Sequence, residues 1–416
     1  MKFDKSLFYL AFVALLIIPG ISCSNKQNKG LEASDQLNYR IDSLFQNAVA
    51  NKEIPGAVAF ISLDGKEVYH KAFGWKNIEN EEPLLKNDIF RMASMTKGLT
   101  AVAILQLIEE GTMHLDDEVH QYIPEFKNPQ ILLEVLPDSG FTGRDASSEI
   151  TIRQLLTHTS GIGYGFQNEV YNALIIKNNI SEGFEDDNRS SYENISRIAK
   201  LPLLYEPGDE YVYSLSYDVL GVVIEQVTGM RFDRYVEQNI LDPLKMNNSY
   251  FFIPEKEQYR LVSVYQPADN GTGLQRTSYP DNEYPVISSR RFFSGGADLC
   301  STAEDYAKFL KMLMNDGKFD HSRILGKSSV AKMLSKQTPF DDGDYDQGFA
   351  AWIINEEGAS IGPRGIGSFQ FGGFYDTFSW ADPEQHLVAV LLLQMYPTNE
   401  HSIHEKFRNA VYSVIH

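Results

Sequence analysis

Apolar residues near the start of the chain follow first a helical and then a strand period. A helical spacing joins five of them: Leu37, Ile41, Leu44, Phe45 and Ala48. The next two apolar stretches, GAVAFISL at 56–63 and EVYHKAFG at 67–74, are typical of strands, and Asp64 with Gly65 between them indicates a tight turn. The pattern therefore predicts a helix followed by a β-hairpin.

The C-terminal part of the chain shows the same kinds of element in reverse order. Strands are predicted at three stretches: GFAAWII at 348–354, FYDTFSWAD at 374–382 and HLVAVLLLQ at 386–394. Ile403, Phe407 and Val411 then recur at helical spacing and predict a closing helix. The middle of the chain is rich in helical patterns and loops. We therefore expect an α+β fold, in which an antiparallel sheet is flanked by helices and a mostly helical lobe is inserted between its two halves.

Length and composition favour one large domain. The chain has 416 residues, of which 43% are hydrophobic, enough to bury a sizeable core. No internal repeat or low-complexity tract divides it. We expect one catalytic domain at 37–416, with a sheet lobe at about 37–110 and 300–416 and a helical lobe at about 111–299. The formal net charge of −19 repels phosphate backbones, so we expect no nucleic-acid partner.

The N-terminus combines two lysines, an apolar run at 7–18, a proline and small residues before Cys23. The apolar run is too short to span a bilayer comfortably, and the segment resembles a bacterial lipoprotein signal, with Gly20 where leucine is usual. We expect a signal peptide at 1–22, lipid attachment at Cys23 and a polar tether at 23–36. The expected location is the bacterial cell envelope, periplasmic or at the outer membrane, with membrane contact through the lipid. The alternative is a plain secretion signal and a secreted soluble protein.

Candidate chemistry begins in RMASMTKGLT at 91–100, where a loop gives way to an apolar helical run. Ser94 and Lys97 are three residues apart and share a helical face, and the backbone N–H groups of a helix N-terminus favour negative charge nearby. The lysine can accept the serine proton only if its pKa falls well below the usual value of about 10.4, which burial would cause. We expect the necessary apolar wall from Leu99, Val102, Ala103 and Leu105.

The spacing alone is weak support for a nucleophile and its base, because short motifs also arise by chance. Ser329 and Lys332 repeat the spacing. No matching partners surround that second pair in the sequence, and we expect it on a solvated helix face. The assignment of Ser94 therefore depends on other segments.

Tyr213 lies in LLYEPGDEYVYSLSYDVLGVVIEQVTG. Pro207 and Gly208 predict a tight turn, and the apolar residues from Val219 onward predict a helix, so Tyr213 is placed in the short loop before that helix. A phenol there can enter a cleft and exchange protons. The alternative is a buried tyrosine whose hydroxyl is satisfied within the core.

Gly372 and Gly373 stand inside the strand pattern of GSFQFGGFYDTFSWADPEQHLVAVLLLQ. Glycine within a strand often marks the close approach of a ligand to the backbone, and the alternative is a β-bulge. If this strand edges the cleft, the backbone N–H groups of Phe374 and Ser94 form an oxyanion hole, in which the loss of one donor typically costs about 2.7 to 4 kcal/mol.

Five segments in this order resemble the serine β-lactamase and penicillin-binding protein superfamily, in particular its class C-related branch and, within that, the family VIII carboxylesterases. The segments are FRMASMTKGLTAVAILQLIEEG, ITIRQLLTHTSGIG, YEPGDEYVYS, SGGADLCSTAEDYAKFLKML and FGGFYDTFSWADP. They extend through nearly the whole chain after the N-terminal segment. The resemblance implies the β-lactamase/transpeptidase-like fold, which agrees with the elements predicted above.

The resemblance also implies a role for each matched residue. Ser94 is then the acylated nucleophile, and Lys97 is its proton partner. Tyr213 is then the general base of acylation and helps to activate water in deacylation. The His-Thr-Ser-Gly segment at 158–161 matches a family signature, to which we assign a structural role.

Two departures from the family pattern bear on the substrate. Leu215 stands two residues after Tyr213, where class C enzymes carry an asparagine that binds a substrate side chain. Phe371 heads the third-motif triplet Phe-Gly-Gly, where drug-binding members have Lys-Thr-Gly or His-Thr-Gly. The missing lysine would face a substrate carboxylate and lower the pKa of the tyrosine, so an ester or amide with a neutral, apolar leaving group is favoured. Arg364 is a candidate for the replacement cation.

These residues predict a serine hydrolase that forms an acyl-enzyme on Ser94 and acts on carboxylic esters or small amides. The sequence contains no G-x-S-x-G motif, so an α/β-hydrolase is not supported. Within the same class the alternative is a D-Ala-peptide hydrolase or a weak β-lactamase, and from another class it is a cell-envelope binder or sensor without turnover. We expect a small-molecule substrate and no metal or other cofactor, with His401 and His404 at a solvated helix start rather than as ligands. The sequence indicates no oligomeric state.

Overall fold

The computed structural model describes residues 22–136, 140–184, 189–277, 283–287, 289–340, 343–397 and 402–415, and for residues 22–34 it describes the backbone alone. Its central sheet has eight strands: β1 (Gly56–Leu63), β2 (Lys66–Asn77), β3 (Glu82–Pro83), β12 (Tyr345–Gln347), β13 (Trp352–Ile354), β14 (Phe369–Gly373), β15 (Thr377–Asp382) and β16 (Leu387–Leu392). They lie in the order β12-β13-β14-β15-β16-β1-β2-β3, and each neighbouring pair is antiparallel.

β1 and β16 join the two ends of the chain within this sheet. Their pairing sets Phe60 opposite Val390 and Ile61 opposite Ala389. Because side chains alternate along a strand, Phe60 and Val390 belong to one hydrophobic cluster and Ile61 and Ala389 to a second cluster on the other face. Both faces of the sheet are therefore covered by other elements.

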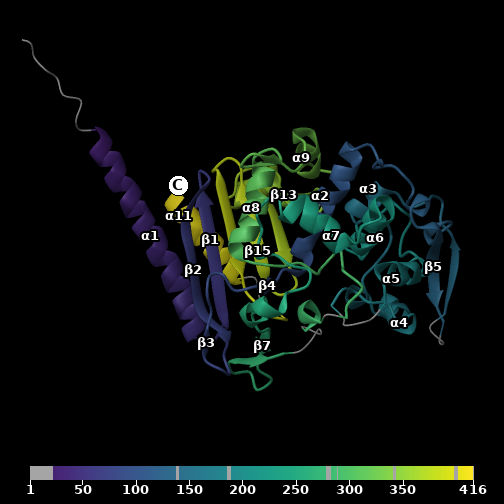
Figure 1. Cartoon of the computed structure of the whole chain (residues 1–416), viewed down its shortest axis with the longest axis horizontal. Helices are drawn as coiled ribbons and strands as arrows, with labels where there is room; N and C mark the ends of the chain where they lie inside the picture. The colour runs from purple at the N-terminus through teal and green to yellow at the C-terminus, as the bar shows by residue number, and fades with distance from the viewer. Residues whose placement is uncertain are drawn as a thin grey trace, which may run out of the picture.

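Two helices from opposite ends of the chain cover the outer face of the sheet. α1 (Ser22–Ala50) and α11 (Ser402–Ile415) lie side by side there (Figure 1). The ring centroids of Phe45 in α1 and Phe407 in α11 are 5.6 Å apart, and Phe407 lies 5.5 Å from Trp380 of β15. All three side chains are fully buried, so aromatic contacts hold both helices against the sheet.

α1 extends further towards the N-terminus than the apolar spacing from Leu37 predicts. Its backbone is helical from Ser22, and the polar tether expected at 23–36 stays a prediction. The signal peptide expected at 1–22 lies outside the described residues except for its last residue, and the side chain of Cys23 lies outside them as well. Lipid attachment stays a prediction. Within the described residues, we find no helix with the length and apolar character needed to cross a membrane.

α8 (Ala303–Met314) packs against the inner face of the sheet, and α2 (Thr96–Glu109) lies between this layer and a helical lobe (Figure 1). The lobe contains α3 (Ile152–Leu156), α4 (Glu169–Lys177), α5 (Ser191–Ile198), α6 (Ser216–Thr228), α7 (Phe232–Val236) and the hairpin of β5 (Gln130–Val135) with β6 (Phe141–Asp145). The hairpin of β7 (Tyr265–Pro267) with β8 (Leu274–Arg276) lies beside the sheet instead, where Tyr265 pairs with Met395 just after β16. β4 (Phe90–Arg91) pairs with β9 (Cys300–Ser301). The segment that enters α2 and the segment that enters α8 are therefore held side by side.

Three shorter elements follow α8 along the chain. They are the hairpin of β10 (Lys318–Phe319) with β11 (Ser322–Arg323), α9 (Lys327–Met333) and α10 (Glu356–Ile361). None of them adds a strand to the central sheet.

The predicted α+β fold, with an antiparallel sheet flanked by helices, is confirmed. The strand predicted at 348–354 is wrong in part, because only the last three residues of this stretch form a strand, β13. Ala350 has a φ of +64°, which interrupts an extended backbone. An added Cβ on Gly348 would lie 2.4 Å from the Met333 carbonyl oxygen. Glycine therefore allows the β12–β13 connection to pack closely against the residues of α9.

Replacing Phe407 by alanine removes the ring that joins α11 to α1 and to the sheet. Truncation of a buried phenylalanine typically costs about 3 to 5 kcal/mol, so we expect a clearly lower thermal unfolding midpoint, measured by circular dichroism. The matched control is Tyr39→Ala on α1, because Tyr39 is 75% exposed and its loss should leave the midpoint nearly unchanged. Equal midpoints for the two variants would contradict this packing.

Candidate active site

Ser94 lies on a short 3-10 helix, η1 (Ala93–Met95), that leads directly into α2. Ala93 has a φ of +46°, a left-handed conformation that is unfavourable for a residue with a side chain. The hydroxyl of Thr96 holds this turn, since Oγ1 donates to the Ala93 carbonyl at 2.6 Å and accepts from the Leu299 N–H at 3.0 Å. Tertiary contacts therefore keep Ser94 on a strained turn, as is common at functional sites.

Lys97 follows on the first turn of α2, and its amine lies 3.2 Å from Ser94 Oγ. The residue is only 2% exposed. Its Nζ donates to the Gly296 carbonyl at 2.9 Å and lies 3.4 Å from Tyr164 Oη. The structure thus brings the serine and the lysine of the sequence motif together.

Aromatic rings surround the lysine amine, and the apolar wall that we expected from α2 stays a prediction. Nζ lies 4.7 Å from the ring centroid of Tyr213, 5.7 Å from that of Tyr164 and 6.0 Å from that of Tyr217. A cation can be stabilised over such ring faces. Two of these tyrosines belong to the segment around the start of α6, and the third belongs to the loop before α4. The periodicity of α2 alone therefore gives no information about them.

Burial lowers the pKa of Lys97 to about 7, and the carboxylate of Asp218 opposes part of this shift. An ordinary lysine is almost fully protonated at neutral pH, whereas a large share of the Lys97 amine is free at pH 7. A general base works best when its pKa lies near the working pH. Lys97 is therefore suited to take the proton of Ser94.

Tyr213 lies in the loop before α6, where the sequence placed it, and it lines the same pocket as Ser94. Burial raises the pKa of Tyr213 above its usual value, so the phenol keeps its proton at neutral pH. The general-base role that the resemblance implied for Tyr213 stays a prediction, and Phe371 stands where a lysine would lower the tyrosine pKa. A protonated phenol beside Ser94 can pass a proton towards a leaving group.

His158 holds the Tyr213 ring in place. The two ring centroids are 4.6 Å apart, and the Ser214 N–H donates to His158 Nδ1 at 3.2 Å. Burial lowers the pKa of His158 well below its usual value, so the imidazole is neutral. The Ser216 hydroxyl connects to those of Ser214 and Ser160 at 2.7 and 2.8 Å. The His-Thr-Ser-Gly segment thus supports the tyrosine loop, in keeping with the structural role that we assigned to it.

The third-motif strand, β14, ends beside the nucleophile turn. An added Cβ on Gly373 would lie 2.3 Å from the Met92 carbonyl oxygen and 2.2 Å from Thr377 Oγ1, so this glycine permits the contact between strand and turn. The register of β14 with β15 is continuous through both glycines, which excludes the β-bulge alternative. Ser94 and Phe374 line the same cleft. The oxyanion hole formed by their N–H groups stays a prediction.

The two residues that depart from the family pattern are both buried. Leu215 belongs to the hydrophobic core and is fully buried. Phe371 is 2% exposed, and its ring centroid lies 6.0 Å from that of Phe309 in α8. α2 also packs closely here, since an added Cβ on Gly98 would lie 3.0 Å from Phe371 Cε1. A packed aromatic ring therefore fills the place of the family cation.

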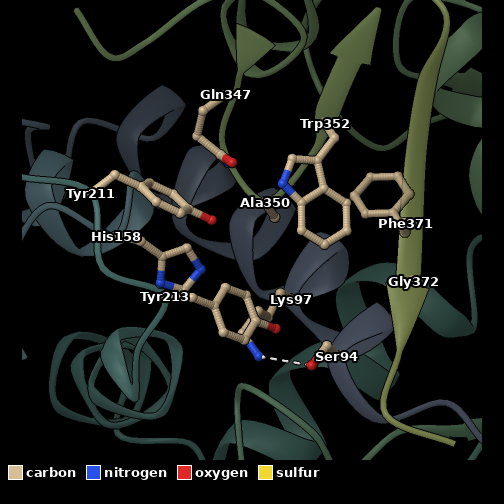
Figure 2. Close-up of a pocket in the computed structure, with 10 residues that line it drawn as sticks. All are labelled: Ser94, Lys97, His158, Tyr211, Tyr213, Gln347, Ala350, Trp352, Phe371 and Gly372. Carbon is tan, nitrogen blue, oxygen red and sulfur yellow. Dashed lines mark hydrogen bonds between the residues drawn. The ribbon is translucent and has the colours of Figure 1, made fainter. Parts of the chain in front are cut away.

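A cleft of about 930 Å³ extends from Ser94 to α11. Its wall includes aromatic side chains from several elements: Phe166, Tyr211, Tyr213, Tyr345, Trp352, Phe374 and Phe378. A narrower recess beside Ser94 and Lys97 is lined by Tyr213 and Phe371. Figure 2 shows Trp352 and Phe371 side by side on one wall of this recess, with Tyr213 lying towards Ser94. The surroundings of the nucleophile are mostly aromatic.

Arg364 does not project into this cleft as a free cation. It is 8% exposed, its Nη1 donates to Gln370 Oε1, and its Nη2 donates to Tyr345 Oη at 2.9 Å. An arginine that does line the cleft is Arg408 of α11, whose pKa is lowered by burial and by the neighbouring Arg364. Glu405 lines the cleft on the same helix and offsets part of this charge. Arg408 and Glu405 therefore place charge at the α11 end of the cleft.

His404 corrects our expectation of a solvated helix start. It is 6% exposed, its Nε2 lies 2.9 Å from Asp376 Oδ1, and its ring stacks on Phe378 with centroids 4.9 Å apart. The first turn of α11 packs against the sheet, so this histidine is enclosed. His401 lies outside the described residues. Among the described residues, no group of three or more His, Cys, Asp or Glu is placed to hold a metal ion.

Sequence reasoning missed Tyr164, Asp218 and Arg408. Asp218 lies in the first turn of α6, where an acidic residue is common for reasons of helix stability alone. Tyr164 follows the 158–161 signature closely, but nothing in its spacing points to Lys97. Arg408 lies between the buried and the exposed side of α11, and the sequence pattern identified only the apolar side of that helix. These residues meet the site only through tertiary packing.

The chain is similar to several known proteins. The family profile described as Beta-lactamase matches residues 41–412. Esterase EstB of Burkholderia gladioli is 28% identical over 374 residues, covering 86% of this chain and 90% of EstB. ML-236A carboxylate methylbutanoyltransferase mlcH of Penicillium citrinum is 27% identical over 403 residues, covering 90% of this chain and 94% of mlcH. The solved structure of EstCE1, described as a hydrolase with promiscuous acyltransferase activity, has a TM-score of 0.78 at 24% identity and covers 91% of this chain and 99% of EstCE1.

The reaction of Ser94 with a fluorophosphonate probe should depend on pH through Lys97. Because the free amine must take the serine proton, we expect the labelling rate to rise with pH around a midpoint of about 7. Intact-protein mass spectrometry at a series of pH values measures this rate, and Ser94→Ala should take no label. A labelling rate that does not change between about pH 5 and about pH 9 would contradict the assigned base.

Proposed function

The chain belongs to the Beta-lactamase family, and we propose that it is a serine hydrolase that cleaves carboxylic esters with apolar groups through an acyl-enzyme on Ser94. The observation that carries this proposal is the buried Lys97 amine, which lies 3.2 Å from Ser94 Oγ and has a pKa of about 7. The esterase name of EstB and the acyltransferase name of mlcH support acyl transfer as the class of reaction.

Acylation begins when Lys97 takes the proton of Ser94 and Oγ attacks the ester carbonyl carbon. The negative charge that develops on the carbonyl oxygen faces the N–H groups of Ser94 and Phe374. The proton held by Lys97 reaches the departing oxygen through the Tyr213 hydroxyl, which lines the same recess as Ser94 and Lys97. The alcohol leaves, and the acyl group remains as an ester on Oγ.

Deacylation reverses these proton transfers with a new nucleophile. Water attacks the acyl carbon and loses a proton to the same groups, so that the acid leaves and Ser94 regains its hydroxyl hydrogen. Transfer of the acyl group to an alcohol is a second candidate. The aromatic wall favours an apolar alcohol over water near the ester, and the names of mlcH and EstCE1 agree with such a reaction.

The walls near Ser94 favour substrates that are uncharged there. Phe371 and Trp352 line the recess, and Phe374 lines the adjoining cleft. A substrate carboxylate beside Phe371 would lose its water without gaining a cation, which is costly. The same argument places lactam and D-Ala-peptide substrates second.

The first test compares hydrolysis of p-nitrophenyl butyrate with that of a chromogenic cephalosporin by the full chain. We expect ester turnover that depends on Ser94 and little cleavage of the cephalosporin, because the third motif lacks its cation. Ser94→Ala is the blank for both substrates. Lactam cleavage at a rate equal to ester cleavage would favour the β-lactamase alternative, and a stable acyl adduct without turnover would favour a binder or sensor.

Tyr213→Phe tests the proton path without changing the shape of the recess. Positioned proton transfer contributes roughly a hundredfold to ten-thousandfold, so we expect kcat/KM for p-nitrophenyl butyrate to fall by about a hundredfold or more. The thermal midpoint should not change. Tyr259→Phe removes a hydroxyl from a residue that is 71% exposed and should have no effect. Equal rates for the two variants would refute the role of Tyr213.

A further inference from the structure

A carboxylate is buried beneath the nucleophile turn. Asp218 lies in the first turn of α6 and is 1% exposed. The Ser294 hydroxyl donates to its Oδ1. Its Oδ2 is buried and accepts no hydrogen bond within the part of the chain that the structure describes. A buried carboxylate oxygen without a donor is costly, so the position calls for an explanation.

Gly296 separates this carboxylate from the lysine. An added Cβ on Gly296 would lie 2.8 Å from Asp218 Oδ2, 3.4 Å from Lys97 Nζ and 3.3 Å from Tyr164 Oη. Three polar atoms therefore surround one side of a residue that has no side chain. The carbonyl of Gly296 accepts a hydrogen bond from Lys97. The amine and the carboxylate thus both border the space that a side chain on Gly296 would fill.

The other titratable groups around Lys97 are neutral. Tyr164, Tyr213 and Tyr217 keep their protons, because burial raises the pKa of each phenol. His158 is uncharged, because burial lowers its pKa well below the usual value. Asp218 is the group whose charge raises the pKa of Lys97 against the effect of burial.

Several neighbouring groups change the pKa of Asp218. Burial is the main cause that raises its pKa, to about 6, while the Ser294 hydroxyl and Lys97 lower it. Asp298 raises it further, but Asp298 forms its own buried ion pair with Arg290. At neutral pH Asp218 is therefore mostly ionised, and Lys97 is a cation whose charge favours the ionised form.

We propose that Asp218 is a positioning residue that supplies the counter-charge for the ammonium formed when Lys97 takes the proton of Ser94. This proposal rests on the proposed function. The proton moves from Ser94 Oγ to Lys97 Nζ, and Asp218 stays ionised throughout. Positive charge then appears on Nζ beside a fixed negative charge in a region shielded from water, where such an interaction is strong. Asp218 makes no contact with substrate in this scheme.

Loss of the Asp218 charge should lower the midpoint of the pH dependence. Without the carboxylate charge, burial acts on Lys97 unopposed, so the lysine pKa falls. Activity then reaches its plateau at a lower pH, because the amine loses its proton earlier. The plateau itself is lower, because a base of lower pKa takes the serine proton less readily. A change in fold alone would not move the midpoint in this direction.

Asp218→Asn in the full chain tests the proposal with fluorophosphonate labelling of Ser94 across the pH range. An opposite charge at short range shifts a pKa by about one to three units, so we expect the midpoint to move down by about one unit or more and the plateau rate to fall about tenfold or more. Glu225→Gln is the matched control. It makes the same chemical change on α6, at a carboxylate that accepts from the Phe232 N–H at 3.0 Å, and it should change neither quantity.

Ser294→Ala is the second variant and leaves the carboxylate in place. It removes the hydroxyl that helps Asp218 to stay ionised, so the midpoint should move in the same direction by a smaller amount. If Asp218→Asn does not fold, this variant decides. The proposal would be overturned if neither Asp218→Asn nor Ser294→Ala changed the midpoint, or if the one variant that folds left it unchanged.

The labelling experiment separates this proposal from the proposed function. It reports the reactivity of Ser94 without using an ester substrate. A wild-type chain that takes the label with the expected pH dependence but does not hydrolyse p-nitrophenyl butyrate would refute the esterase function and leave the role of Asp218 to the variants. Ester hydrolysis by the wild-type chain with an unshifted Asp218→Asn labelling profile would retain the function and refute the counter-charge.

Discussion

The burial of one amine beside one hydroxyl is the constraint on which the rest of the structure depends. Lys97 lies 3.2 Å from Ser94 Oγ and is 2% exposed, and only in such a place does a lysine become a base at neutral pH. Burial of this kind cannot come from a single helix. The rings of Tyr164 and Tyr213 and the backbone of Gly296 reach the amine from separate parts of the chain, so the site exists only when the sheet and the helical lobe are assembled.

The sheet contributes position rather than charge. β14 meets the nucleophile turn at Gly373, where the approach to the Met92 carbonyl leaves no room for a side chain. The same strand places the Phe371 ring where related enzymes have a cation. Together these features combine a reactive serine with apolar surroundings, a combination that suits acyl transfer between neutral molecules better than recognition of an anion.

Features that depend on spacing within one element could be predicted from the sequence. The strands β1 and β2, the closing helix and the proximity of Ser94 to Lys97 are of this kind. Contacts between elements could not, and the aromatic rings around Lys97 are contacts of this second kind. Asp218 gave no signal because an acid in the first turn of a helix is ordinary. His404 was expected in solvent because a period of three or four residues identifies one apolar face but not how far the neighbouring sheet extends over the rest of the helix.

The division of the cleft between two sets of residues has a consequence for the evolution of substrate choice. The groups to which we assign proton transfer are buried and belong to α2, to the start of α6 and to the turn at Gly296. The open part of the cleft is lined by Phe166 before α4 and by residues of α11 such as Arg408. Substitutions in this outer set can alter which acyl group or alcohol enters without disturbing the proton path. A common catalytic centre can therefore serve hydrolases and transferases whose substrates have little in common.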